Sequence, residues 1–164
     1  MTEYRYPATI QEALNTLVEA SGKARLIAGG TDLMPDMRDG KITPDILVDI
    51  TRIPGMKTIT IGEDAVTVGA AVTFADLKNH TRLTIRLHAL QDAARSVGAG
   101  AIQNAATWVG NLIQAMPAAD GAIIALALEG EIQLWDQNGD RWLPVEDLFL
   151  GPGRSAVDPT SQLI

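Results

Sequence analysis

Cysteine is absent from this chain of 164 residues. The chain therefore carries no disulfide bond, no thiolate-ligated iron–sulfur cluster and no cysteine nucleophile. It also lacks a run of lysine or arginine long enough to follow a nucleic-acid backbone, and 20 acidic residues against 13 basic ones give a net charge of −7. We therefore expect no nucleic-acid partner.

Long apolar runs are missing too, so no segment reaches the length of a membrane span. The N-terminal sequence Met1-Thr2-Glu3-Tyr4-Arg5-Tyr6 lacks the basic region and apolar stretch of a signal peptide. We expect a soluble cytoplasmic protein. Its content of 46% apolar and 20% charged residues is that of a globular chain, and its length suffices to bury a core within one domain.

Motifs for several kinds of catalysis are also absent. The sequence has no Gly-x-Ser-x-Gly elbow and no Gly-x-x-x-x-Gly-Lys phosphate loop. His80 and His88 stand eight residues apart without the spacing of metal ligands. We predict no metal site and no catalytic acid or base.

The first third of the sequence alternates between helical and strand patterns. Thr9-Ile10-Gln11-Glu12 has the form of a capping box before a helix that ends at Gly22. Residues 25–28 and 46–50 have strand patterns, and residues 33–39 form a short helix between them. This alternation predicts a small parallel βαβ lobe. The apolar residues of the first helix share one face: Ile10, Leu14, Leu17 and Val18.

From about residue 56 the pattern changes to short β segments mixed with helices. Residues 58–61 and 65–70 predict one hairpin, and residues 131–135 and 141–145 predict another around Asn138-Gly139. The sequence therefore predicts an α+β fold with two lobes, residues 1–55 and residues 56–164, the second built from antiparallel sheet and helices.

Three helices and the entrance to a further strand are predicted in the rest of the chain. Thr73-Phe74-Ala75-Asp76 is typical of a helix cap, and the apolar stripe from Leu83 to Val97 predicts one longer helix. The apolar run from Ala122 to Leu128 predicts a buried helix with Pro117 in its first turn. Gln162-Leu163-Ile164 indicates the entrance to a further strand.

Two glycine-bearing segments, each predicted to form a turn or loop, make up the candidate ligand site. The first, Ala28-Gly29-Gly30-Thr31-Asp32-Leu33, follows the apolar pair Leu26-Ile27, so its backbone N–H groups can approach a ligand with no Cβ in the way. The second, Thr107-Trp108-Val109-Gly110-Asn111, adds a hydroxyl and an amide. Because the chain is acidic, a phosphate would be held mainly by N–H dipoles and hydroxyls. Taken alone, Gly29-Gly30 is equally consistent with an ordinary tight turn.

The order of these segments resembles that in the FAD-binding medium subunit of the molybdenum hydroxylases, the enzymes like xanthine dehydrogenase and carbon monoxide dehydrogenase. Met116-Pro117-Ala118-Ala119-Asp120 and the tail Phe149-Leu150-Gly151-Pro152-Gly153 also carry the resemblance. It implies the two-lobed PCMH-type FAD-binding fold and an FAD cofactor. It further implies a large molybdopterin-binding subunit and a small iron–sulfur subunit as partners, with electrons passing from the iron–sulfur clusters through FAD to an external acceptor. Such subunits continue into a C-terminal domain, which we expect to be absent from this chain.

The resemblance also implies which residues hold the cofactor. The two glycine segments would cradle the FAD pyrophosphate, Asp120 would contribute to dinucleotide binding, and Val97 would lie against the cofactor. Asp32 and Asp120 are expected either to accept hydrogen bonds from ribose hydroxyls or to cap the helices that follow them. The implied cofactor-binding residues are Leu26, Ile27, Ala28, Gly29, Gly30, Thr31, Asp32, Leu33, Val97, Thr107, Trp108, Val109, Gly110, Asn111 and Asp120.

Two departures from the family pattern leave alternatives open. Val109 stands where the family usually has glycine, and a positive φ there would be strained. Gln103 stands where arginine is usual, which removes a positive charge. The chain is therefore either an FAD-binding electron-transfer component or a non-catalytic assembly domain that has weakened or lost FAD binding. A flavoenzyme of the same fold without molybdenum partners is a third interpretation.

Overall fold

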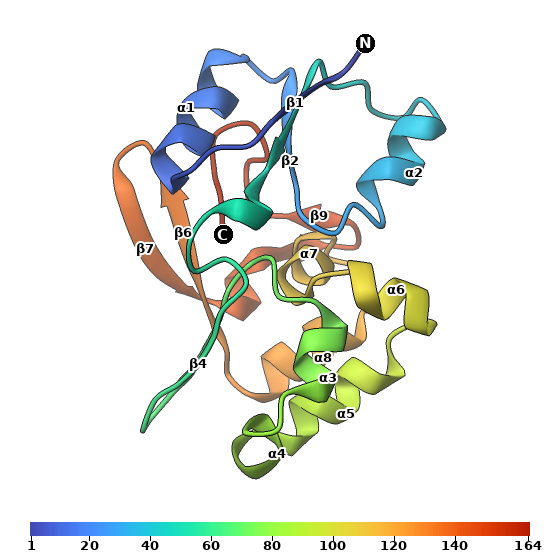
Figure 1. Cartoon of the computed structure of the whole chain (residues 1–164), viewed down its shortest axis with the longest axis vertical. Helices are drawn as coiled ribbons and strands as arrows, with labels where there is room; N and C mark the ends of the chain where they lie inside the picture. Colours follow the sequence, from blue (N-terminus) through green and yellow to red (C-terminus); the bar gives the residue numbers. More distant parts are fainter.

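The computed structural model describes residues 1–164, the side chains of Thr84 and Arg86 excepted. Figure 1 shows the N-terminal strands with α1 (Ile10–Glu19) and α2 (Leu33–Arg38) at one end of the molecule. The helices from α3 (Phe74–Asn79) to α6 (Gly100–Ala105) lie at the other end, and the hairpin of β6 (Glu131–Asp136) and β7 (Gly139–Pro144) runs along one side.

A three-stranded parallel sheet organises the N-terminal part. Its order is β1-β3-β2, so α1 follows the outer strand β1 and α2 connects β2 to β3. The predicted parallel βαβ arrangement is therefore confirmed, and β1 is a strand that the sequence patterns did not predict. The elements are β1 (Glu3–Arg5), α1 (Ile10–Glu19), β2 (Ala24–Ile27), α2 (Leu33–Arg38) and β3 (Ile46–Asp49).

The first helix begins at the predicted cap, with one difference. The Thr9 side chain accepts a hydrogen bond from the Glu12 backbone N–H at 3.1 Å, whereas the Glu12 carboxylate accepts from Ala8 N–H at 2.7 Å. In a capping box the Glu12 carboxylate would accept from the N–H of Thr9 itself, whereas here it accepts from the residue before Thr9. Val18 was expected on the buried stripe and is instead 44% exposed, because the helix turns Ala13, Leu14 and Leu17 toward the core.

The remaining residues form short strands and short helices, which lie below and beside this sheet in the view of Figure 1. Both predicted hairpins are confirmed, and Thr73 and Asp76 form the predicted capping box. The elements are η1 (Ile50–Arg52), β4 (Ile59–Ile61), β5 (Val66–Val68), α3 (Phe74–Asn79), α4 (Leu83–Arg86), α5 (His88–Ser96), α6 (Gly100–Ala105), α7 (Trp108–Ile113), α8 (Asp120–Ala127), β6 (Glu131–Asp136), β7 (Gly139–Pro144), η2 (Val145–Leu148), β8 (Phe149–Gly151) and β9 (Arg154–Ser155).

The expectation of one helix from Leu83 to Val97 is wrong. The chain bends at Leu87, whose φ of −138° and ψ of 58° lie outside the helical region, and this residue separates α4 from α5. Leu87 packs against the core cluster that contains Leu83 and Leu90. The helical spacing of the apolar residues therefore does not produce one continuous helix, because packing of Leu87 in the core interrupts it.

Two expectations about α8 are also wrong. Pro117 lies in a turn before the helix, because Ala119 takes an extended conformation and α8 begins at Asp120. The helix is buried on one face only, since Ile123 and Leu126 are 56% and 43% exposed. An apolar sequence on all sides of a helix does not reveal which face is covered.

The core contains three clusters of buried side chains. The cluster beneath the parallel sheet includes Leu14 and Leu17 of α1, and it also contains Val109 of α7 and Leu163 near the C-terminus. The Leu163 backbone pairs with Trp135 of β6, with N···O distances of 3.0 and 2.7 Å. The boundary between residues 55 and 56 stays a prediction, and side chains from both sides of it share this cluster.

Candidate functional site

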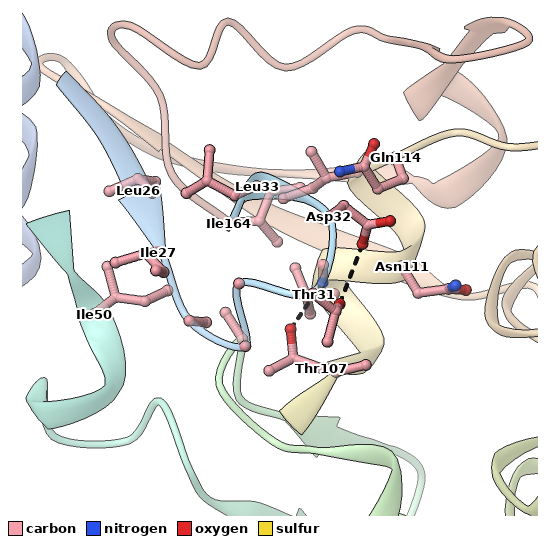
Figure 2. Close-up of a pocket in the computed structure, with 18 of the residues that line it drawn as sticks. Leu26, Ile27, Thr31, Asp32, Leu33, Ile50, Thr107, Asn111, Gln114 and Ile164 are labelled. Atoms are coloured by element: carbon pink, nitrogen blue, oxygen red, sulfur yellow. Dashed lines mark hydrogen bonds between the residues drawn. The ribbon is translucent and has the colours of Figure 1, made fainter. Parts of the chain in front are cut away.

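A cleft of about 440 Å³ lies between the loop that joins β2 to α2 and the segment that joins α6 to α7 (Figure 2). Both glycine segments of the sequence contribute to it. Of the residues predicted to bind the cofactor, all line the cleft except Trp108 and Asp120. The structure therefore brings together two segments that stand about seventy-five residues apart in the chain, as expected for a ligand site built from both.

The loop after β2 depends on its two glycines for different reasons. Gly30 has φ of +68°, a conformation that residues with a side chain rarely adopt. A Cβ on Gly29 would overlap the carbonyl oxygen of Ala105 and lie 2.9 Å from its carbonyl carbon. Gly29 thus allows the two sides of the cleft to approach each other closely.

The same loop leaves hydrogen-bond donors free. Within the described part of the chain, the backbone N–H groups of Gly29, Gly30 and Thr31 have no hydrogen-bond partner. The Thr31 hydroxyl donates to the Asp32 carboxylate at 3.2 Å. Successive unpaired N–H groups of this kind form a concave surface suited to an anion.

Asp32 does not cap α2. It stands at the N-cap position, but it takes helical backbone angles and its exposed carboxylate makes no capping hydrogen bond. Side-chain caps require an extended backbone at that position, so the geometry rules out the capping interpretation. The other expectation, that Asp32 accepts a hydrogen bond from a ribose hydroxyl, stays a prediction.

The second glycine segment is the first turn of helix α7, not a loop. Thr107 is the N-cap, and its side-chain oxygen accepts a hydrogen bond from Gly110 N–H at 3.1 Å. The Thr107 hydroxyl hydrogen remains available to a ligand, because the oxygen acts there as acceptor. Figure 2 shows Thr107 and Asn111 on this side of the cleft.

Val109 is not strained. It lies within α7, is 8% exposed, and packs in the core cluster beneath the parallel sheet, and it is not among the residues with positive φ. A helix accommodates a β-branched side chain at small cost. The expected penalty for valine at this position is therefore absent.

Trp108 and Asp120 are directed elsewhere. The Trp108 indole N–H donates to the Gly121 carbonyl at 2.9 Å, so the ring packs against α8. Asp120 is half-buried in the first turn of α8 and makes no capping hydrogen bond. Residues that follow each other in a helix point about 100° apart, so a continuous helical segment cannot face the cleft with every side chain.

Gln103 is buried and does not line the cleft, and its side chain links α6 to α3 and to the end of α5. Its side-chain oxygen accepts from the Lys78 ammonium at 2.5 Å, and its amide nitrogen donates to the carbonyl oxygens of Arg95 and Val97 at 3.1 and 3.0 Å. These bonds fix the chain after α5, where Val97 reaches the cleft wall. The side chain acts on this wall through the backbone, because it points toward α3 and α5.

The charges at the cleft are acidic. Among its described lining residues, Asp32 and Asp36 are the charged ones, and neither lysine nor arginine is present. Asp36 is paired with Lys41 at 2.7 Å, and this hydrogen bond raises the pKa of Lys41 above its usual value. An anionic group in this cleft must therefore rely on N–H, hydroxyl and amide donors.

The sequence patterns missed the side chains that complete the walls. They come from α2 and the segment that follows it, η1, the segment before α3, the stretch from α6 through α7, and the C-terminal tail, and most are apolar. No local motif marks them, because only the folded chain brings them together. They are Asp36, Ile42, Ile50, Ala70, Ile102, Ala106, Ile113, Gln114, Pro159 and Ile164.

Comparison with known proteins gives consistent results. Residues 1–164 match the family described as the FAD binding domain in molybdopterin dehydrogenase. The chain is 32% identical over 152 residues to the nicotinate dehydrogenase FAD-subunit of Eubacterium barkeri, covering 92% of this chain and 51% of that protein. It is 32% identical over 162 residues to the carbon monoxide dehydrogenase medium chain of Hydrogenophaga pseudoflava, covering 99% and 56%.

A solved structure of the Hydrogenophaga pseudoflava carbon monoxide dehydrogenase, in a form that lacks the Mo-pyranopterin moiety, superposes with a TM-score of 0.94 at 29% identity, over 99% of this chain and 56% of that one. The family resemblance and the α+β fold class are thus confirmed. The chain spans about half the length of the curated relatives it matches. In its described part, no helix combines the length and apolar character needed to cross a membrane.

Proposed function

Because the chain belongs to the family of FAD-binding domains of molybdopterin dehydrogenases, we propose that it binds FAD in the cleft between the β2–α2 loop and α7. One observation carries this proposal. The unpaired N–H groups of Gly29, Gly30 and Thr31 face the same cleft as Thr107 and Asn111. These are donors from two separate segments, and a pyrophosphate needs several of them.

The residues present fit this cofactor. The cleft volume of about 440 Å³ lies within the range of small-molecule sites, about 300–1,000 Å³. Apolar side chains such as Ile27, Val97 and Ile102 form walls suited to flat ring systems. Gly29 and Gly30 leave space that a Cβ would fill. We assign the phosphate contacts to the first loop, Thr107 and Asn111, while Asp32 is placed to accept from a ribose hydroxyl.

The flavin supplies the redox chemistry when bound. The residues of this chain bind it, orient it and exclude water from it, and none of them acts as a general acid or base. We further propose that the chain is the electron-transfer component of a molybdenum hydroxylase. In that assembly it takes electrons from the iron–sulfur clusters of a small subunit, beside a large molybdopterin-binding subunit, and delivers them to an external acceptor. The cytoplasmic location stays a prediction.

The assembly-domain alternative is weakened by two findings. Val109 takes unstrained helical angles, and Gln103 contacts α3 and α5 away from the cleft lining. Both departures from the family pattern are therefore compatible with a formed cleft. The alternative remains an outcome of the test below.

Freshly purified protein tests the proposal directly. We expect the yellow absorbance of bound flavin, release of FAD on denaturation, and a rise in melting temperature when FAD is added to stripped protein. Protein without flavin and without a thermal shift would support the assembly-domain alternative. Flavin-loaded protein that purifies without molybdenum and iron–sulfur subunits would support a flavoenzyme that acts without such partners.

A further inference from the structure

Gly121, in the first turn of α8, lies where α8 packs against α7, and no sequence motif singled it out. We propose that Gly121 is a positioning residue that seats the Asn111 side chain at the edge of the cleft, so that its amide N–H groups are presented to the cofactor phosphates. This inference rests on the proposed binding of FAD in the cleft.

The contact between Gly121 and α7 leaves no space for a side chain. Gly121 is buried, and a Cβ added to it would overlap the Asn111 amide oxygen and lie 2.9 Å from Cδ1 of Trp108. Trp108 and Asn111 are three residues apart, so they lie on the same face of α7. Gly121 therefore fits between these two side chains because it has none of its own.

A hydrogen bond fixes the backbone of Gly121 in this position. The Trp108 indole N–H donates to the Gly121 carbonyl oxygen at 2.9 Å. This bond ties the start of α8 to α7 on the side of Trp108. A substituted residue at position 121 cannot move away from Asn111 without breaking it.

The Asn111 amide shows the consequence of this packing. Its Oδ1 atom is buried and has no hydrogen-bond partner within the described part of the chain. A buried acceptor without a donor is costly, and native proteins retain few of them. Because the oxygen is held against α8 and Asn111 lines the cleft, the amide nitrogen is the group left to donate to a ligand.

A double-mutant cycle on the full chain tests this role. We expect Gly121→Ala and Asn111→Ala each to weaken FAD binding about tenfold, as for one lost hydrogen bond to a charged group. The double variant should bind FAD no more weakly than Asn111→Ala alone, because both changes remove the same interaction. Affinity is measured by quenching of flavin fluorescence at a temperature at which every variant is folded.

Gly130→Ala is the matched control. Gly130 follows the other end of α8, where a Cβ would lie 3.1 Å from the Ala125 carbonyl oxygen. This change disturbs α8 without contact to Asn111. We expect a lower melting temperature with unchanged FAD affinity, which separates the positioning of Asn111 from general damage to the helix.

Nuclear magnetic resonance of stripped protein gives a second readout. The side-chain amide signals of Asn111, assigned by their loss in Asn111→Ala, should shift in Gly121→Ala before any FAD is added and shift in the wild type on FAD addition. Wild-type affinity in Gly121→Ala, or a loss equally large with and without Asn111, overturns this inference while FAD binding stands. A wild-type protein that binds no FAD overturns the proposed function and this inference together.

Discussion

Replacing Gly29 by alanine adds a single methyl group at the contact between the two sides of the cleft. Gly29 does not have a positive φ, so the change tests space and not backbone conformation. The new Cβ would overlap the Ala105 carbonyl oxygen and lie 3.1 Å from Cα of Ala106. These are backbone atoms, so no side chain can rotate out of the way. We expect the β2–α2 loop and the segment before α7 to separate by about an ångström.

The expected loss of stability follows from this overlap. Overpacking of a filled site costs about 1–3 kcal/mol, and a contact with rigid backbone belongs in the upper part of that range. For a chain of this size, 1 kcal/mol corresponds to about 2–4 °C in melting temperature, so a loss of about 2–3 kcal/mol should lower the melting temperature of the variant by about 4–12 °C. The same displacement moves the N–H groups of Gly29 and Gly30 relative to Thr107. Loss of one charge-assisted hydrogen bond weakens FAD binding at least about tenfold.

Gly100→Ala provides the matched control for Gly29→Ala. Gly100 begins α6, lacks a positive φ, and has nothing within 4 Å of an added Cβ. Alanine there restricts the unfolded chain and should be neutral or stabilising by about 0.4–1 kcal/mol. Melting temperatures of stripped protein and FAD affinities are compared for the two variants. Equal melting temperatures and equal affinities would refute the assignment of Gly29 as the contact that closes the cleft.

Three further predictions concern other parts of the molecule. Gly30→Val should lower FAD retention far more than His88→Ala, because valine is strained at φ of +68°; equal flavin absorbance per protein would contradict this. Gln103→Leu should lower the free energy of unfolding by about 2–3 kcal/mol in chemical denaturation, because it removes three hydrogen bonds made by a buried side chain; an unchanged denaturation midpoint would contradict this structural role of Gln103. Hydrogen bonds from Thr160 lower the pKa of Asp158 in the folded protein. The contribution of this carboxylate to the free energy of unfolding is therefore fully present above its unfolded-state pKa of about 4, and it is lost as the pH falls through its lower folded-state pKa. Asp158→Asn should therefore be less stable than the wild type at pH 7, and the difference should shrink below pH 4; a difference that is constant with pH would refute it.

Local signals explain why much of the fold was predictable. The cap at Thr9, the capping box at Thr73 and the hairpin predicted around Asn138-Gly139 each depend on neighbours in the sequence, and all three formed, although the hairpin turn lies one residue earlier, at residues 137–138. Strand β1 was not predicted, because its three residues are too few to show an alternation of apolar and polar side chains. Its pairing with Ile46–Asp49 also depends on residues far away in the sequence. The bend at Leu87 likewise follows from packing in the core.

In the site too, features that depend on neighbouring residues were predicted, whereas features that depend on distant residues were not. The pair Gly29-Gly30 indicated the first loop, yet its contact with Ala105 involves residues far apart in the chain. The second segment contributes to the cleft, but the prediction of a turn directed every one of its residues toward the ligand. In the helix, Thr107 and Asn111 reach the cleft while Trp108 turns to α8. Sequence order identifies a segment, whereas the secondary structure decides which of its side chains reach a ligand.

The acidic character of the chain makes the geometry of the cleft more important. With a net charge of −7 and a lining whose charged residues, among those described, are Asp32 and Asp36, general electrostatic attraction does not favour a pyrophosphate. Lys41 neutralises Asp36 locally and is itself occupied by that pair. Attraction must then come from aligned N–H, hydroxyl and amide donors, whose strength depends on distance and angle within a few tenths of an ångström. Such a site tolerates little displacement of its backbone, and this is why the two positions without a side chain at its contacts, Gly29 and Gly121, carry the strongest expectations for FAD binding.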